Sequence, residues 1–203
     1  MLSLHVRPVL ARVVDPVAAA LLRAGVSPDA ITVLGTVGVV TGALALFPRG
    51  ELFWGTIVVT VFVLTDMLDG AMARRLSRRS VFGAWLDSTC DRLADAAVFS
   101  GLVLWFMGEG DDTLLAGVAL FCLVAGSLVS YAKARAEGLG LRCDVGLAER
   151  AERLIVVLVA AGFSGLGVTW ALPVGLWALA VASAVTVMQR LLEVRRQAAA
   201  AVR

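Results

Sequence analysis

The stretch TDMLDGAMARRLSRRSVFGAWLDSTCDRLADA, residues 65–96, places five aspartates and five arginines between two long apolar runs. The chain around it has 203 residues, of which 60% are hydrophobic, and its mean hydropathy is +0.89. Soluble domains are usually nearer half apolar, so this composition indicates a membrane protein. Carboxylates placed where lipid is expected therefore need a chemical explanation.

The apolar runs have the length of membrane spans. A helix that crosses about 30 Å of hydrocarbon needs about 20 apolar residues. Six segments approach that length: residues 30–47, 52–73, 81–106, 114–136, 149–163 and 170–192. We therefore expect an all-α integral membrane protein in which residues 27–203 form one domain of six transmembrane helices. Residues 1–26 mix apolar and charged side chains, which predicts an N-terminal amphipathic, juxtamembrane helix lying on the membrane surface.

The basic residues predict the orientation. Of the 18 lysines and arginines, all but Arg49 lie in four places. These are the N-terminal arm, the second and fourth connections between spans together with the helix ends beside them, and the C-terminal end. Cytoplasmic loops carry such an excess of positive charge. We therefore expect a multi-pass protein of the cell membrane with both termini, and the aspartate-rich end, on the cytoplasmic side.

The aspartates repeat at helical spacing. Asp66 and Asp69 are three residues apart, and Asp87, Asp91 and Asp95 recur every fourth residue, so each set shares one helix face. Facing lipid, each carboxylate would cost about 2.5–3.5 kcal/mol. A polar cavity that holds a cation or protons would remove this cost. Oxygen ligands without a nearby histidine favour Mg²⁺, Mn²⁺ or Ca²⁺ over zinc.

Two other interpretations of the aspartates are open at this point. Any single aspartate could belong to a charge cluster at the membrane interface, paired with the arginines at positions 74, 75, 78 and 79. The whole array could belong to a cation transporter, because carboxylates within membranes also bind cations and relay protons. Transporters usually have internal repeats and broken helices near the midplane, and neither is evident in this sequence.

The spacing of these residues resembles that of a known family. The pattern Asp66-x2-Asp69-Gly70-x2-Ala73-Arg74-x8-Gly83-x3-Asp87-x3-Asp91 is similar at all eight specified positions to the signature of the CDP-alcohol phosphotransferases. These are six-helix membrane enzymes of phospholipid synthesis, in which an alcohol hydroxyl displaces CMP from a CDP-linked donor. The resemblance therefore implies a phospholipid-synthesis transferase, and it suggests a homodimer.

The resemblance also implies roles for individual residues. Two divalent cations, Mg²⁺ or Mn²⁺, are expected on Asp66, Asp69, Asp87 and Asp91, with Asp91 also serving as the catalytic general base. Residues expected to bind the CDP donor are Gly70, Ala73, Arg74 and Gly83. A Pro-Asp-x-x-Thr element typical of the family adds Asp29 and Thr32 on the cytidine side.

The acceptor alcohol is predicted from basic residues and from a closer resemblance. Lys133, Arg135, Arg153 and Arg190 lie at the predicted cytoplasmic helix ends, and such groups suit a phosphate. Membrane orientation alone would also explain them. The segments LRAGVSPDAITVLGT, SYAKARAEGLGLR and ERAERLIVVL resemble the actinobacterial branch of the family that makes phosphatidylinositol phosphate.

That branch implies the substrates CDP-diacylglycerol and inositol 1-phosphate, with the four basic residues on the acceptor phosphate. Synthesis of phosphatidylglycerophosphate, from another phosphorylated acceptor, is the alternative within the family. Membrane lipids are expected partners, and nucleic acid is not.

Overall fold

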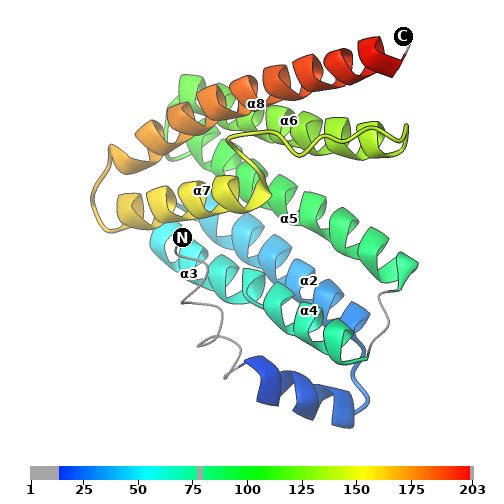
Figure 1. The fold of residues 1–203 in the computed structure, drawn as a ribbon. Coiled ribbons are helices and arrows are strands. Elements are labelled where there is room, and N and C mark those ends of the chain that lie inside the picture. Colours follow the sequence, from blue (N-terminus) through cyan, green and yellow to red (C-terminus); the bar gives the residue numbers. More distant parts are fainter. Residues whose placement is uncertain (1–13, 77–79, 202–203) are drawn as a thin grey trace. The chain divides into compact units, whose positions relative to one another are not determined.

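A computed structural model describes residues 14–76 and 80–201, and every regular element in these two ranges is a helix (Figure 1). The predicted all-α class is therefore confirmed. A helix that includes residues 14–23 comes first. It is followed by α2 (Pro28–Leu46), the 3₁₀ turn η1 (Phe47–Arg49), α3 (Leu52–Val63), α4 (Asp66–Arg75), α5 (Val81–Met107), α6 (Thr113–Glu137), α7 (Arg150–Gly165) and α8 (Ala171–Ala201).

The second predicted span is two helices rather than one. Leu64 and Thr65 separate α3 from α4. The hydroxyl of Thr65 donates to the carbonyl oxygen of Phe62 at 2.6 Å, and the backbone N–H of Thr65 donates to the same oxygen at 3.1 Å. Such local bonds replace the regular i to i−4 pattern and tighten the chain at this point. Each of the other five predicted segments contains one helix.

Four stretches among the described residues are long and apolar enough to cross a membrane: Pro28–Arg49, Leu52–Arg75, Thr113–Glu137 and Ala171–Ala200. α5 carries several charged residues near its start, and α7 has only 16 residues, so neither is among the four. These lengths and compositions support a membrane protein. Six transmembrane helices stay a prediction.

The chain divides into two compact units, and the first comprises Met1–Gly42 with Val58–Ala94. Here the helix over residues 14–23 packs through Ala18 on Ala71 and Met72 of α4, and all three side chains are buried. α2 packs closely through Gly38, because a β-carbon there would lie 2.2 Å from the Phe62 ring. Small residues allow helices in membranes such close approach. Residues 1–13 of the predicted amphipathic arm, and Arg78 and Arg79, lie outside the described residues.

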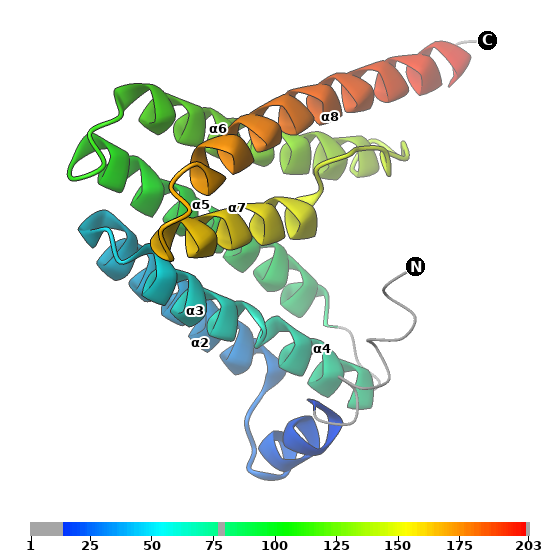
Figure 2. The same ribbon diagram turned by 90° about the vertical axis from the view of Figure 1, so that its left-hand side faces the viewer.

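The second unit comprises Ala43–Ile57 and Asp95–Arg203. α8 packs along both α6 and α7, as the two views show (Figures 1 and 2). Leu172 and Leu176 of α8 are fully buried, and the thiol of Cys122 on α6 reaches the carbonyl oxygen of Leu176 at 3.5 Å. Cys90, Cys122 and Cys143 are free thiols.

Candidate functional site

The start of α2 belongs to the first unit and carries two of the predicted donor-binding residues. Ser27 caps this helix, since its hydroxyl accepts a hydrogen bond from the N–H of Ala30 at 3.2 Å, and Pro28 occupies the first helical position. Asp29 and Thr32 follow within the first turns. Thr32 is buried, and its hydroxyl donates to a carboxylate oxygen of Asp69 on α4.

Three of the predicted metal ligands are neighbours in this unit. Asp69 is buried, and no basic side chain of the described residues pairs with it. The carboxylates of Asp66 on α4 and Asp87 on α5 lie near enough to repel its charge. Asp69 itself is bound by two neutral groups, the hydroxyl of Thr32 and the backbone N–H of Gly70.

A divalent cation fits these carboxylates by donor type, because hard cations prefer carboxylate oxygens. The side chains do not converge on one point, however. Among the residues that the structure describes, no three His, Cys, Asp or Glu side chains are close enough together to hold one ion. Asp91, the fourth predicted ligand, is half-buried on α5 and forms an ion pair with Arg92 at 3.6 Å.

The small residues of the pattern border these groups. A β-carbon at Gly83 would lie 3.1 Å from a carboxylate oxygen of Asp29, so a side chain there would press on that group. A β-carbon at Gly70 would lie 3.3 Å from the guanidinium of Arg74. Ala73 is half-buried, and Arg74 is exposed at the end of α4. The ten residues predicted to bind the metal ions or the CDP donor all belong to the first unit.

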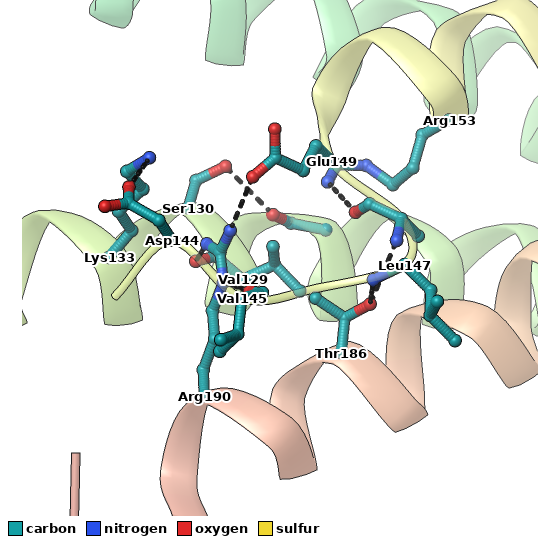
Figure 3. Close-up of polar contacts among 12 residues, drawn as sticks. Val129, Ser130, Lys133, Asp144, Val145, Leu147, Glu149, Arg153, Thr186 and Arg190 are labelled. Carbon is teal, nitrogen blue, oxygen red and sulfur yellow. Dashed lines mark hydrogen bonds and ion pairs between the residues drawn. The ribbon is translucent and has the colours of Figure 1, made fainter. Parts of the chain in front are cut away.

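Arg153 is the first of the predicted acceptor-phosphate residues, all of which lie in the second unit, and Figure 3 shows it with Lys133 and Arg190. Its side chain is only 2% exposed. It donates to the carboxylate of Asp95 on α5 at 3.0 Å and to the carbonyl oxygen of Ala148 at 3.1 Å. The second oxygen of Asp95 lies 3.6 Å from Arg150. Asp95, whose role the sequence leaves open, is thus the buried counterion of two arginines.

Arg190 and Lys133 also have carboxylate partners. Arg190 is 2% exposed, donates to the carbonyl oxygens of Val129 and Val145, and pairs with Glu149 at 3.4 Å. Lys133 pairs with Asp144 at 2.7 Å. The hydrogen bond and charge of the Lys133 ammonium hold the pKa of Asp144 below its usual range.

Arg135, the fourth predicted residue, is exposed, unlike the two buried arginines. A membrane-orienting role suits Arg135 as well as a phosphate-binding one.

The loop over residues 138–149 is a feature that sequence patterns do not predict. The buried hydroxyl of Thr186 on α8 accepts the N–H groups of Leu147 at 3.1 Å and of Ala148 at 3.0 Å. Gly146 permits this approach, because its φ is +150° and a β-carbon there would lie 2.6 Å from the Thr186 methyl group. Gln197 adds two bonds to the backbone of Arg142.

A cavity of about 490 Å³ lies where this loop meets α8. None of the predicted site residues lines it; its walls are Val145, Gly146, Leu147, Gln189, Leu192, Glu193 and Arg196.

Comparison with known proteins identifies the fold and the relatives. Residues 25–188 match the family model for CDP-alcohol phosphatidyltransferases. The chain is 54% identical to a phosphatidylinositol phosphate synthase of Streptomyces avermitilis, over 99% of this chain and 85% of that protein. It is 53% identical to the synthase of the same name from Mycobacteroides abscessus, over 96% of this chain and 89% of that protein.

Solved structures of the Mycobacterium tuberculosis phosphatidylinositol phosphate synthase are also similar, each at 53% identity. The structure with CDP-DAG bound has a TM-score of 0.88 and covers 91% of this chain and 94% of its own. The structure in complex with manganese and citrate has a TM-score of 0.86 and covers 89% and 88%. With the family model matching most of its length and relatives above 50% identity, the chain belongs to the CDP-alcohol phosphatidyltransferase family of membrane enzymes.

Proposed function

We propose that the chain transfers the phosphatidyl group of CDP-diacylglycerol to inositol 1-phosphate and releases CMP. The observation that carries this proposal is the conjunction of the eight-position aspartate pattern with relatives more than 50% identical that are named for this product. Family membership argues against the cation-transporter interpretation.

The first unit would hold the donor. Asp66, Asp69, Asp87 and Asp91 would bind two divalent cations, Mg²⁺ or Mn²⁺, and a manganese-bound relative supports this choice. When bound, such cations neutralise the pyrophosphate and stabilise the leaving group. The remaining donor contacts fall to residues of the pattern and of the α2 start: Asp29, Thr32, Gly70, Ala73, Arg74 and Gly83.

Asp91 would act on the acceptor. As general base it would take the proton of the inositol hydroxyl as the oxygen attacks the β-phosphorus, and the bond from that phosphorus to the CMP oxygen would break. A carboxylate is a weak base, so proton transfer concerted with attack is expected.

Lys133, Arg135, Arg153 and Arg190 would hold the acceptor phosphate. Arginine offers paired N–H donors whose geometry matches phosphate oxygens. The buried position of Arg153 and Arg190 supports a fixed site over a purely orienting role for these two.

Membership of the family also supports a proposal for the membrane topology. We propose six spans with α5 and α7 among them, an amphipathic arm at residues 1–26 ahead of a domain at residues 27–203, cytoplasmic termini, a cytoplasmic site and a homodimer. Cysteine-accessibility labelling in inverted vesicles would test the topology, and light scattering of the detergent-solubilised protein would test the dimer.

The testing experiment measures CMP release by purified protein in detergent with CDP-diacylglycerol and Mg²⁺. It compares inositol 1-phosphate, free inositol and glycerol 3-phosphate as acceptors, and includes a chelated sample without divalent cation. Metal-dependent turnover with inositol 1-phosphate alone supports the proposal, and preference for glycerol 3-phosphate would replace it with phosphatidylglycerophosphate synthesis.

The Asp91→Asn variant should lose turnover. Its matched control is Asp111→Asn in the exposed α5–α6 turn. Asparagine accepts the left-handed φ of +42° found there, so this control should stay folded and active.

A further inference from the structure

The carboxylates that face the proposed phosphate-binding cations differ in burial. Asp95, the partner of Arg153, has a side chain only 10% exposed and lies within α5. Asp144, the partner of Lys133, is 72% exposed, and Glu149, the partner of Arg190, is 50% exposed. Figure 3 shows these last two carboxylates reaching the cations from the loop over residues 138–149.

The backbone of this loop is held independently of its two acidic side chains. Thr186 binds its N–H groups at Leu147 and Ala148, and the Nε of Arg190 donates to the carbonyl oxygen of Val145 at 2.9 Å. A change of side-chain rotamer would therefore move Asp144 or Glu149 away from its cation without unfolding the loop. Exposed side chains change rotamer readily, and water can solvate a carboxylate that has left.

We infer that Asp144 and Glu149 occupy the positions of acceptor-phosphate oxygens and are displaced when the acceptor binds, so that they set the enzyme's affinity and selectivity for it. This inference rests on the proposed function. Carboxylate and phosphate oxygens compete for the same N–H donors, and a phosphate brings more charge and more oxygens to them.

Selectivity follows from the same competition. An acceptor without a phosphate carries no negative charge that could replace the carboxylates of Asp144 and Glu149 on their cations. The two ion pairs would therefore stay in place and occupy the acceptor site, which lowers the affinity for such an acceptor. Asp95 differs, because its burial and its two arginine partners leave it no solvated alternative. Asp95 would therefore remain in place and fix Arg153 while Asp144 and Glu149 exchange with the ligand.

The test compares Asp144→Asn and Glu149→Gln with the matched control Glu152→Gln. Glu152 is exposed in the first turn of α7 and forms no ion pair with a described residue, so its variant makes the same charge change without releasing a cation. Exposed ion pairs are weak, so each of the first two variants should lower the acceptor KM about two- to fivefold, and Glu152→Gln should leave the KM unchanged.

A second readout separates this inference from the proposed function. Calorimetric titration with inorganic phosphate measures displacement without turnover, and Asp144→Asn should bind phosphate about two- to fivefold more tightly than the wild type. If the wild type does not turn over inositol 1-phosphate, the proposed function fails, and the titration alone decides the inference. Equal phosphate binding by wild type and Asp144→Asn, or an equal gain in Glu152→Gln, would overturn it.

Discussion

Replacement of Asp95 by asparagine tests the buried ion pair that joins α5 to α7. The change keeps the shape of the side chain but removes the negative charge 3.0 Å from Arg153 and 3.6 Å from Arg150. Removing one partner of a buried pair costs about 3–5 kcal/mol. We expect the lower limit, about 3 kcal/mol, because asparagine retains one acceptor oxygen and Arg153 keeps its bond to Ala148.

For a chain of about 200 residues, 1 kcal/mol corresponds to about 2–4 °C, so Asp95→Asn should lower the Tm by about 6–12 °C. Thermal unfolding in one detergent at a fixed scan rate, with Asp111→Asn as the control, measures this shift. The double variant Asp95→Leu with Arg153→Met should recover most of the Tm, because apolar side chains replace a buried pair at little cost. It should still lack turnover, since Arg153 would be gone. A Tm for Asp95→Asn within about 1 °C of the wild type would refute the reasoning.

Substitutions at two further positions and one labelling experiment test other features of the structure. Gly38→Ala should destabilise the first unit by about 1–3 kcal/mol, because its β-carbon would press on the Phe62 ring; an unchanged Tm would contradict the close packing of α2. Thr186→Val should lower the free energy of unfolding by about 1–3 kcal/mol, because the N–H groups of Leu147 and Ala148 lose their acceptor. Thr186→Ser keeps the hydroxyl and should retain most of the stability. Equal Tm values for the two variants would count against this. Burial raises the pKa of the Cys143 thiol above its ordinary value of 9.0, so less of it is thiolate at pH 8. Maleimide should therefore label Cys143 more slowly than it labels the amino acid cysteine in solution, and mass spectrometry would measure the rate. Labelling at the rate of the free amino acid would contradict the burial of Cys143.

The helical segments could be predicted from the sequence because long apolar runs leave few alternatives in a membrane. Ser27 and Pro28 also mark the start of α2 where the structure has it. The break at Leu64 and Thr65 could not be predicted, because it depends on one threonine hydroxyl bonding to a carbonyl three residues earlier. The short α7, by contrast, lies within two residues of the predicted segment 149–163, and only its crossing of the membrane stays a prediction.

The candidate site was predictable to different extents in its two parts. Fixed spacing on α4 and α5 indicates which aspartates share a face, and Asp66 and Asp87 lie near enough to Asp69 to repel its charge, while the metal-ligand set stays a prediction. The partners of the basic residues were not predictable. Asp95 and Arg153 are 58 positions apart in the chain, so no local pattern relates them. Asp144 and Glu149 lie in a loop whose path depends on backbone bonds to α8.

The two groups of charged residues differ in how their charge is compensated. Asp69 is buried with a neutral partner and repelled by its neighbours, so the cation of the proposed function would offset its charge. Lys133 and Arg190 already have carboxylates of the chain itself, which an acceptor phosphate would displace under the proposed function. Loss of a carboxylate should therefore have opposite effects on the two substrates. Removing one from α4 should weaken use of the CDP donor, whereas removing Asp144 should strengthen use of the acceptor.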